Sequence, residues 1–346
     1  MKFQIDTEFM KDCFREVVSV PSPVGYFEEL NPVLARYAAA FGKEITYDNR
    51  HTAYITLDGQ DNSKTVLISA HGDTLGMMVR CVDANGMLRF RVLGGMNLHS
   101  VEGETVTVHA SNGKKYTGLV ACQNHSTHVF RGANNVERTE DTMVVILDED
   151  VKTREQVRAL GICNGDYISV DPRCQITDNG YIKSRYIDDK GPVACCLTLL
   201  KYLADNGLKP KYRTLLAFPY YEEVSTGGRY VPEEVSEYIA VDIALIGPEL
   251  EGNERSVTVC AKDANGPYDY ALRKRLVAYA QKAGCSWVED VFLVYSSDAH
   301  AVERGGNNVA SALVGMGTYC THGMERTHVE GMENTVKLLL AYALDI

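Results

Sequence analysis

The chain has 346 residues, enough for two domains or one large one, with 45% hydrophobic residues and a formal net charge of −11. This acidic balance argues against a nucleic-acid partner, and no apolar run reaches the roughly 18 residues of a membrane span. Ten cysteines without a CxxC pair, and charges within the N-terminal apolar stretch, predict a cytoplasmic protein with reduced thiols and no membrane partner.

Helical and strand-like patterns alternate at both ends of the chain. Before residue 77, helices are expected over 9–20 and 27–42, strands over 44–59, and a buried strand over 64–73. The alternation returns later, with helices expected over 188–207, 269–284 and 334–344, and strands over 213–221, 238–247 and 308–317. This order is typical of an open α/β sheet covered by helices.

The stretch 77–166 has a different pattern. It contains short alternating strands joined by Asn-Gly turns, as in "ETVTVHASNGKKYTGLVAC". We therefore predict one catalytic domain formed by 1–76 plus 167–346, interrupted by a β-rich insert at 77–166.

Ionisable residues gather where the predicted strands end, which is the edge at which open α/β sheets bind ligands. They are His71, Asp73, Asp188, Asp189, Glu222, Glu223, Asp242 and His322. Each alone has a structural interpretation: a helix N-cap for the Asp pair, a solvated turn for the Glu pair, and a structural role for each histidine.

Taken together, these residues predict a metal site. Carboxylates brought close to one another repel, so a cluster of them requires a cation. Imidazole and carboxylate ligands suit Zn²⁺ or Co²⁺, with Mn²⁺ as a further option. The number of carboxylates favours two divalent ions per chain that share one carboxylate.

The order of these motifs resembles metallopeptidase family 42, the di-metal aminopeptidases that include the TET-type, glutamyl and deblocking enzymes. "SPVGYFEEL" is similar to the family's SPSGxE segment, "AHGDTLGMMV" to HxDEIGxMV, and "YYEEVSTGG" to EEVGxRG. The segments that resemble its remaining blocks are "NGDYISVDPRCQITDNGYIKSRYIDDKGPVAC", "IAVDIA", "KDANGPYD", "SSDAHAVERGG" and "THGMERTH". The resemblance covers nearly the whole chain.

The resemblance implies a ligand set for two metals. His71 and Asp242 would hold one ion, and Glu223 and His322 would hold the other. Asp188 would bridge the two ions.

It also implies the residues that act around the metals. Glu222 would be the general base, and Asp73 would accept a hydrogen bond from the imidazole of His71 and fix its tautomer. The peptide bond between Asp188 and Asp189 would be cis, as is typical of the family.

Three features leave alternatives open. Thr74 stands where the family usually has Glu. His328 competes with His322 as the last ligand, and His322 is favoured because it follows a strand and precedes Glu325 in a family-like spacing. Asp298, which we expect to precede a strand, would either contact substrate or order a loop.

Histidines within the insert have no clear metal partners. His125 and His128 lie three residues apart in an expected loop without matching carboxylates, so a structural or substrate-edge role is favoured. His99 and Ser100 could line the active site of a neighbouring subunit, and a solvated loop is the favoured interpretation.

The resemblance also implies the overall fold and activity. The fold would be a doubly wound, mixed α/β sheet of the phosphorylase/hydrolase-like type with an inserted small β-barrel that mediates a homodimer, and a homododecamer is the larger assembly open to it. The activity would be release of N-terminal residues from short peptides. The alternatives are a metal-dependent deacylase or carboxypeptidase-like hydrolase of small amides, and an inactive oligomeric binding protein.

Overall fold

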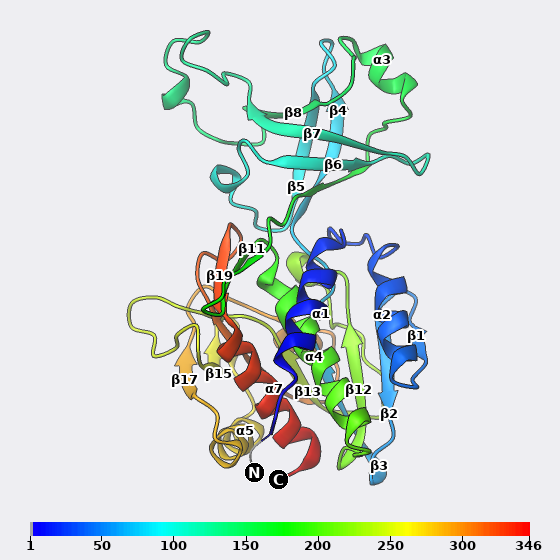
Figure 1. Cartoon of the computed structure of the whole chain (residues 1–346), viewed down its shortest axis with the longest axis vertical. Helices are drawn as coiled ribbons and strands as arrows, with labels where there is room; N and C mark the ends of the chain where they lie inside the picture. The colour runs from blue at the N-terminus through cyan, green and yellow to red at the C-terminus, as the bar shows by residue number, and fades with distance from the viewer. Residues whose placement is uncertain (1–2) are drawn as a thin grey trace. The chain divides into compact units, whose positions relative to one another are not determined.

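A computed structural model describes residues 3–346 (Figure 1). It divides into two compact units: one extends up to Asp73 and resumes over Arg173–Ile346, and the other is Thr74–Pro172. The first unit contains the large sheet, and the second contains a closed barrel.

The large sheet of the first unit has four parallel strands at its centre. β12 (Tyr212–Phe218), β3 (Asp61–Ser69), β13 (Val235–Val241) and β18 (Ala310–Thr318) lie in this order and run in the same direction. Antiparallel partners flank them, so the sheet is mixed. The other strands are β1 (Ile45–Tyr47), β2 (Ala53–Leu57), β14 (Ala244–Leu245), β15 (Val257–Asp263), β16 (Gly266–Pro267) and β17 (Trp287–Val291). The carboxyl ends of the parallel strands therefore meet at one edge.

Helices cover the sheet on both faces. α1 (Thr7–Ser19) and α7 (Val329–Leu344) both contact α4 (Ile187–Asp205), and α7 also contacts α5 (Tyr270–Ala283) (Figure 1). α2 (Leu30–Ala40) lies against β1 and β2. The helix α6 (Asp298–Arg304) lies against β13 and β18.

A separate core cluster forms under α6. Leu67, Leu215 and Tyr238 of the sheet pack in one buried cluster with Ala299 and Val302 of α6. Because successive side chains of a strand point to opposite faces, the neighbours of these residues face the other side of the sheet. The doubly wound arrangement predicted from the sequence is confirmed.

A small three-stranded sheet lies beside the main one. It is formed by β10 (Gln175–Ile176), β11 (Tyr181–Ser184) and β19 (Glu325–His328), in that order. β11 leads into α4, and β19 leads directly into α7.

The second unit is a six-stranded closed barrel, which confirms the predicted small β-barrel. Its order is β4 (Gly76–Val82), β5 (Leu88–Leu93), β8 (Met143–Leu147), β7 (Lys115–Cys122), β6 (Thr105–His109) and β9 (Tyr167–Val170). Alternate residues, such as Val79, Phe90, Val108 and Ile168, fill its core. The helix α3 (Arg154–Ala159) and the 3₁₀ turns η1 (Leu98–Ser100) and η2 (Ala133–Asn135) complete it.

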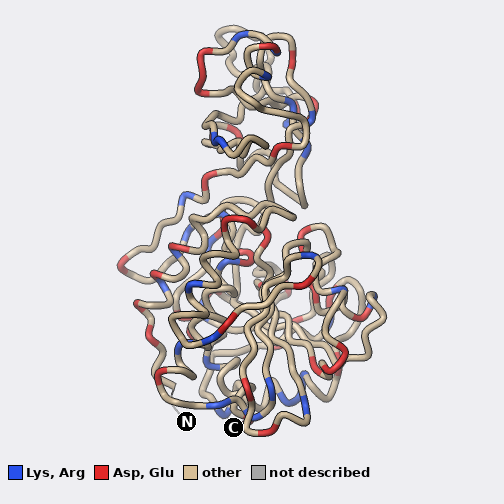
Figure 2. The backbone as a smooth tube through the Cα atoms, turned by 90° about the vertical axis from the view of Figure 1, so that its right-hand side faces the viewer, with Lys and Arg blue, Asp and Glu red and all other residues tan. Residues whose placement is uncertain are grey.

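Acidic and basic residues are interleaved along the backbone of both units (Figure 2). The net charge of −11 is therefore spread through the fold. Within residues 3–346, no helix has the length and apolar character needed to cross a membrane.

Candidate metal centre

The predicted site residues lie just beyond the carboxyl ends of the parallel strands. His71 follows β3, Asp242 follows β13, and His322 lies in the turn after β18. Glu222 and Glu223 open the 3₁₀ turn η3 (Glu222–Val224) beyond β12. These ends are adjacent because the strands are adjacent and parallel, as the sequence pattern predicted.

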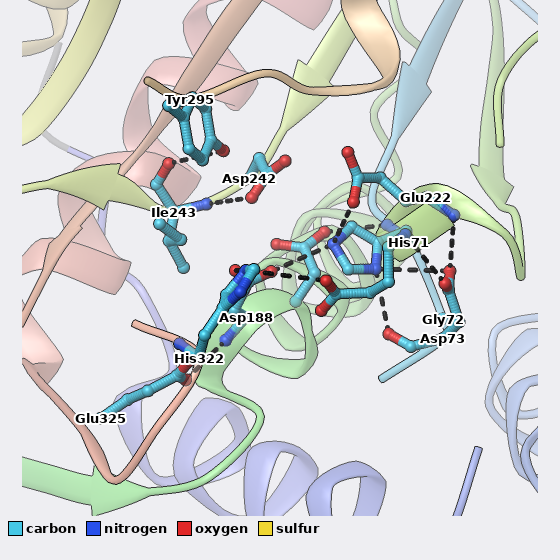
Figure 3. A network of polar contacts seen from close by, with 12 residues as sticks. His71, Gly72, Asp73, Asp188, Glu222, Asp242, Ile243, Tyr295, His322 and Glu325 are labelled. Atoms are coloured by element: carbon cyan, nitrogen blue, oxygen red, sulfur yellow. Dashed lines mark hydrogen bonds and ion pairs between the residues drawn. The ribbon is translucent and has the colours of Figure 1, made fainter. Parts of the chain in front are cut away.

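Asp188, at the start of α4, joins the other residues into one centre (Figure 3). Its Oδ1 lies 3.0 Å from Nε2 of His71, and its Oδ2 lies 3.9 Å from Nε2 of His322. Oε2 of Glu223 lies 3.6 Å from the same His322 nitrogen. Asp188 thus faces one imidazole with each of its oxygens.

Two groups of side chains in the described part of the chain have donor atoms close enough to hold a metal ion. One contains His71, Asp188, Asp189 and Asp242, and the other contains Asp188, Glu223 and His322, with the donor atoms of each within 4.8 Å of one another. All five residues predicted as ligands are brought together. Asp189 was not predicted as a ligand, and its Oδ2 accepts a hydrogen bond from the backbone N–H of His71 at 2.8 Å.

The hydrogen bonds of His71 leave one ring nitrogen for a metal. Nδ1 lies 3.0 Å from the backbone carbonyl of Asp73, which can only accept, so Nδ1 carries the proton. Nε2 faces the carboxylate of Asp188, and a metal bound at this nitrogen would take the place of its proton. A neutral imidazole of this tautomer is the form that binds a metal.

Buried charge dominates the site. Burial raises the pKa of Glu223 well above its usual value, and the neighbouring Asp188 adds to the rise. Burial and Asp188 likewise raise the pKa of Asp242 to about 6. Burial opposes a charged His71, yet the carboxylates of Asp189, Asp188 and Asp73 raise the pKa of its imidazole well above the usual value. Acidic groups that destabilise one another in this way call for a cation.

Unpaired acceptors give a direct test of whether these residues fit a metal. Oε1 of Glu223 and Oδ1 of Asp189 are buried and have no hydrogen-bond partner among residues 3–346. A buried carboxylate oxygen without a donor is costly, and coordination of a cation would satisfy it. The residues present therefore fit divalent metal ions held by nitrogen and oxygen ligands.

Asp73 is fully buried and holds two neighbouring backbone groups. Its Oδ1 accepts the N–H of Glu222 at 3.1 Å, and its Oδ2 accepts the N–H of Glu223 at 3.2 Å. The distance from Oδ1 to Nδ1 of His71 is 3.4 Å. Asp73 therefore contacts the turn that carries both glutamates as well as the imidazole that it was predicted to orient.

Glu222 projects into the same centre. Its Oε2 lies 3.8 Å from Nε2 of His71, and its side chain is only 12% exposed. Burial raises the pKa of Glu222 well above its usual value, and Asp242, Asp298 and Glu223 add to this effect against the opposing His71.

The backbone at the site has two unusual features. The peptide bond between Asp188 and Asp189 is cis. His322 has a left-handed φ of 64°, which non-glycine residues adopt rarely.

His328 has a structural position in the described fold. Its Nε2 donates to the carbonyl of Asn179 at 2.8 Å, and its Nδ1 accepts the N–H of Glu330 at 3.0 Å, which caps α7. Both ring nitrogens are engaged, so His328 is not a free ligand in place of His322.

The remaining candidates belong to neither of the two metal-binding groups. The buried hydroxyl of Thr74 donates to the carbonyl of Leu75 at 3.0 Å. Neither group includes His125 or His128, which are exposed in the second unit. His99, in η1, is also exposed, and Ser100 is partly buried.

Asp298 opens the short helix α6, which was not predicted, and the strand expected after it is β18. Both of its carboxylate oxygens are buried without a hydrogen-bond partner among the described residues. Burial raises its pKa to about 8.

Comparisons with known proteins agree with this geometry. Residues 52–338 match the family described as M42 glutamyl aminopeptidase. A curated relative, "Putative aminopeptidase YhfE" of Bacillus subtilis (strain 168), is 37% identical over 332 residues, which cover 96% of each chain. The chain belongs to the M42 glutamyl aminopeptidase family. Membership assigns it to the metallo-aminopeptidases, a class of hydrolases.

Solved structures show the same fold. The TET aminopeptidase of a Thaumarchaeota archaeon from marine sediment superimposes with a TM-score of 0.87 at 16% identity, covering 98% of this chain and 97% of that one. The TET1 peptidase of Pyrococcus horikoshii gives a TM-score of 0.84 at 20% identity, covering 97% and 100%. The latter is described as assembling into a tetrahedron or a large octahedral shell.

Proposed function

We propose that this chain is a di-metal aminopeptidase that releases N-terminal residues from short peptides. The observation that carries the proposal is the convergence of two imidazoles and several carboxylates on Asp188, whose two oxygens face different histidines. A single-metal site would need only one of these groups. Family membership supports the peptidase activity.

The ligand roles follow from the two groups of donor atoms. His71 and Asp242 would hold one ion, Glu223 and His322 the other, and Asp188 would lie between them. The nitrogen and oxygen donors suit Zn²⁺ or Co²⁺, with Mn²⁺ as a further option. When bound, two such ions supply Lewis-acid polarisation of the scissile carbonyl and lower the pKa of a water molecule.

Glu222 is the proposed general base. It lies in the centre without belonging to either metal-binding group, and its buried carboxylate has a raised pKa that favours proton uptake. It would accept the proton of the attacking water and deliver it to the amine that leaves. Asp73 keeps the backbone of Glu222 and the ring of His71 in place.

The assembly and location of the chain belong to the same proposal. The barrel at Thr74–Pro172 would mediate a homodimer, and dimers could build a dodecamer as TET-type relatives do. All ten cysteines are free thiols, which suits a reducing cytoplasm.

A substrate panel tests the activity. Metal-free protein would be reconstituted with Zn²⁺ or Co²⁺ and assayed on aminoacyl p-nitroanilides and on N-acylated amino acids. We expect hydrolysis of the free-amine substrates, dependent on added metal. Cleavage of the acylated compounds alone would instead support a deacylase, and no cleavage at full metal content would support a binding protein.

A further inference from the structure

Glu325 is a buried carboxylate that connects two of the candidate ligands through their backbones. Its Oε2 accepts the N–H of Asp188 at 3.0 Å, and its Oε1 accepts the N–H of His322 at 3.1 Å. The residue is 2% exposed. Figure 3 shows that Glu325 and His322 lie on the same side of Asp188.

The turn that presents His322 depends on such a restraint. The backbone bridge between Tyr319 and Arg326 closes this turn at its base. Within it, Cys320 and His322 have φ values of 58° and 64°, a region that is unfavourable for residues with a Cβ. The His322 side chain is 39% exposed, so packing holds it less firmly than it holds buried His71.

The contact with Glu325 also satisfies the backbone N–H of Asp188. Its backbone lies where α4 begins with non-helical angles, so its N–H has no place in the helical ladder. Glu325 supplies the acceptor for that N–H. Glu325 therefore accepts the backbone N–H of Asp188, which belongs to both metal-binding groups. It also accepts the N–H of His322, which belongs only to the second group.

We propose that Glu325 is a positioning residue that fixes His322 relative to Asp188 and thereby sets the affinity of the second metal site. This inference rests on the proposed di-metal function. Because each oxygen accepts one N–H, a glutamine at this position would face one of the two N–H groups with its own NH₂ donor. The first site shares Asp188, but its His71 is held by Asp189 and by the Asp73 carbonyl, so this site would be less affected.

A matched control separates positioning from general stabilisation. Asp290, on β17, is also buried and also accepts two backbone N–H groups, those of Glu251 at 2.9 Å and Gly252 at 3.0 Å. It belongs to neither metal-binding group. Asp290→Asn thus removes the same kind of contact without touching the ligands.

The experiment is a calorimetric titration of metal-free protein with Zn²⁺ or Co²⁺ alone, on wild type, Glu325→Gln and Asp290→Asn. We expect two ions per wild-type chain. In Glu325→Gln, the first ion should bind within about threefold of wild type and the second at least about 10-fold more weakly, the size of effect typical of groups that support metal ligands. Asp290→Asn should bind both ions within about threefold of wild type, well below the tenfold change that about 1.4 kcal/mol produces.

Glu325→Asp is the second variant, because it keeps the charge but shortens the side chain so that both N–H groups cannot be reached together. It should show the same selective loss, and it decides the question if the glutamine variant does not fold. Wild-type affinity for both ions in the folded variants, or an equal loss in Asp290→Asn, would overturn the role of Glu325. Fewer than two ions on wild type would instead contradict the proposed di-metal function.

Discussion

Replacing Asp73 with alanine tests how the site is built. The change removes the fully buried carboxylate that accepts two backbone N–H groups, those of Glu222 and Glu223. An unsatisfied buried group costs about 1–3 kcal/mol, so the two cost about 2–6 kcal/mol in the free energy of unfolding. Loss of the repulsion between Asp73 and Glu223 offsets part of this cost. We therefore expect metal-free Asp73→Ala to be destabilised by about 2–4 kcal/mol.

Urea unfolding of metal-free protein, followed by circular dichroism, measures this change. Asp73→Asn keeps one acceptor oxygen, so it should lose about half as much stability as the alanine variant. Asp150→Asn, at an exposed position, is the control and should stay within about 0.5 kcal/mol of wild type. Stability of Asp73→Ala within that same range would refute the view that Asp73 holds the turn of the two glutamates.

Glu237 accepts hydrogen bonds from Lys64 and, at 2.7 Å, from Arg275. Burial opposes its charge, but these partners hold its pKa below the ordinary 4.5. Glu237→Gln should therefore lower the free energy of unfolding of metal-free protein at pH 7 by about 1–3 kcal/mol, since the partners are partly exposed. The difference from wild type should shrink as pH falls below 4.5, where the unfolded-state carboxyl protonates first, and a pH-independent difference would contradict the assignment. His322→Ala should reduce the metal content measured by mass spectrometry from two ions to one, whereas His328→Gln should lower thermal stability and keep both ions. The reverse pattern would make His328 the ligand.

Much of the candidate site could be predicted because its ligands follow strands with clear apolar patterns. His71 follows the buried strand over 61–69, and Asp242 follows the one over 235–241. Once parallel strands are assumed, their carboxyl ends must meet, and polar residues at those ends become neighbours without any knowledge of side-chain positions.

Other features had no local signal. The helix that begins at Asp298 has seven residues, too few to display a helical period, and the sequence predicted only the strand that follows it. The small sheet pairs Tyr181 with His328, which are far apart in the sequence, and nothing near either residue predicts the pairing. The choice between His322 and His328 likewise depends on a distant carbonyl, that of Asn179, which engages His328.

The same limit applies to the supporting carboxylates. The sequence places Asp73 two residues after His71, which suggested contact with the imidazole. Its bonds to the N–H groups of Glu222 and Glu223 depend on how the turn after β12 approaches β3. A spacing pattern can therefore identify groups that bind a metal, but it does not reveal the backbone groups that hold them in place.

The most direct test of the central claim is a paired measurement on Glu222→Gln. Metal content and aminopeptidase turnover would be determined on the same reconstituted sample. Because Glu222 belongs to neither metal-binding group, the variant should retain two ions per chain. Loss of a general base should lower kcat by about 10²–10⁴-fold. Wild-type turnover with both ions bound would contradict the role of Glu222 as the base.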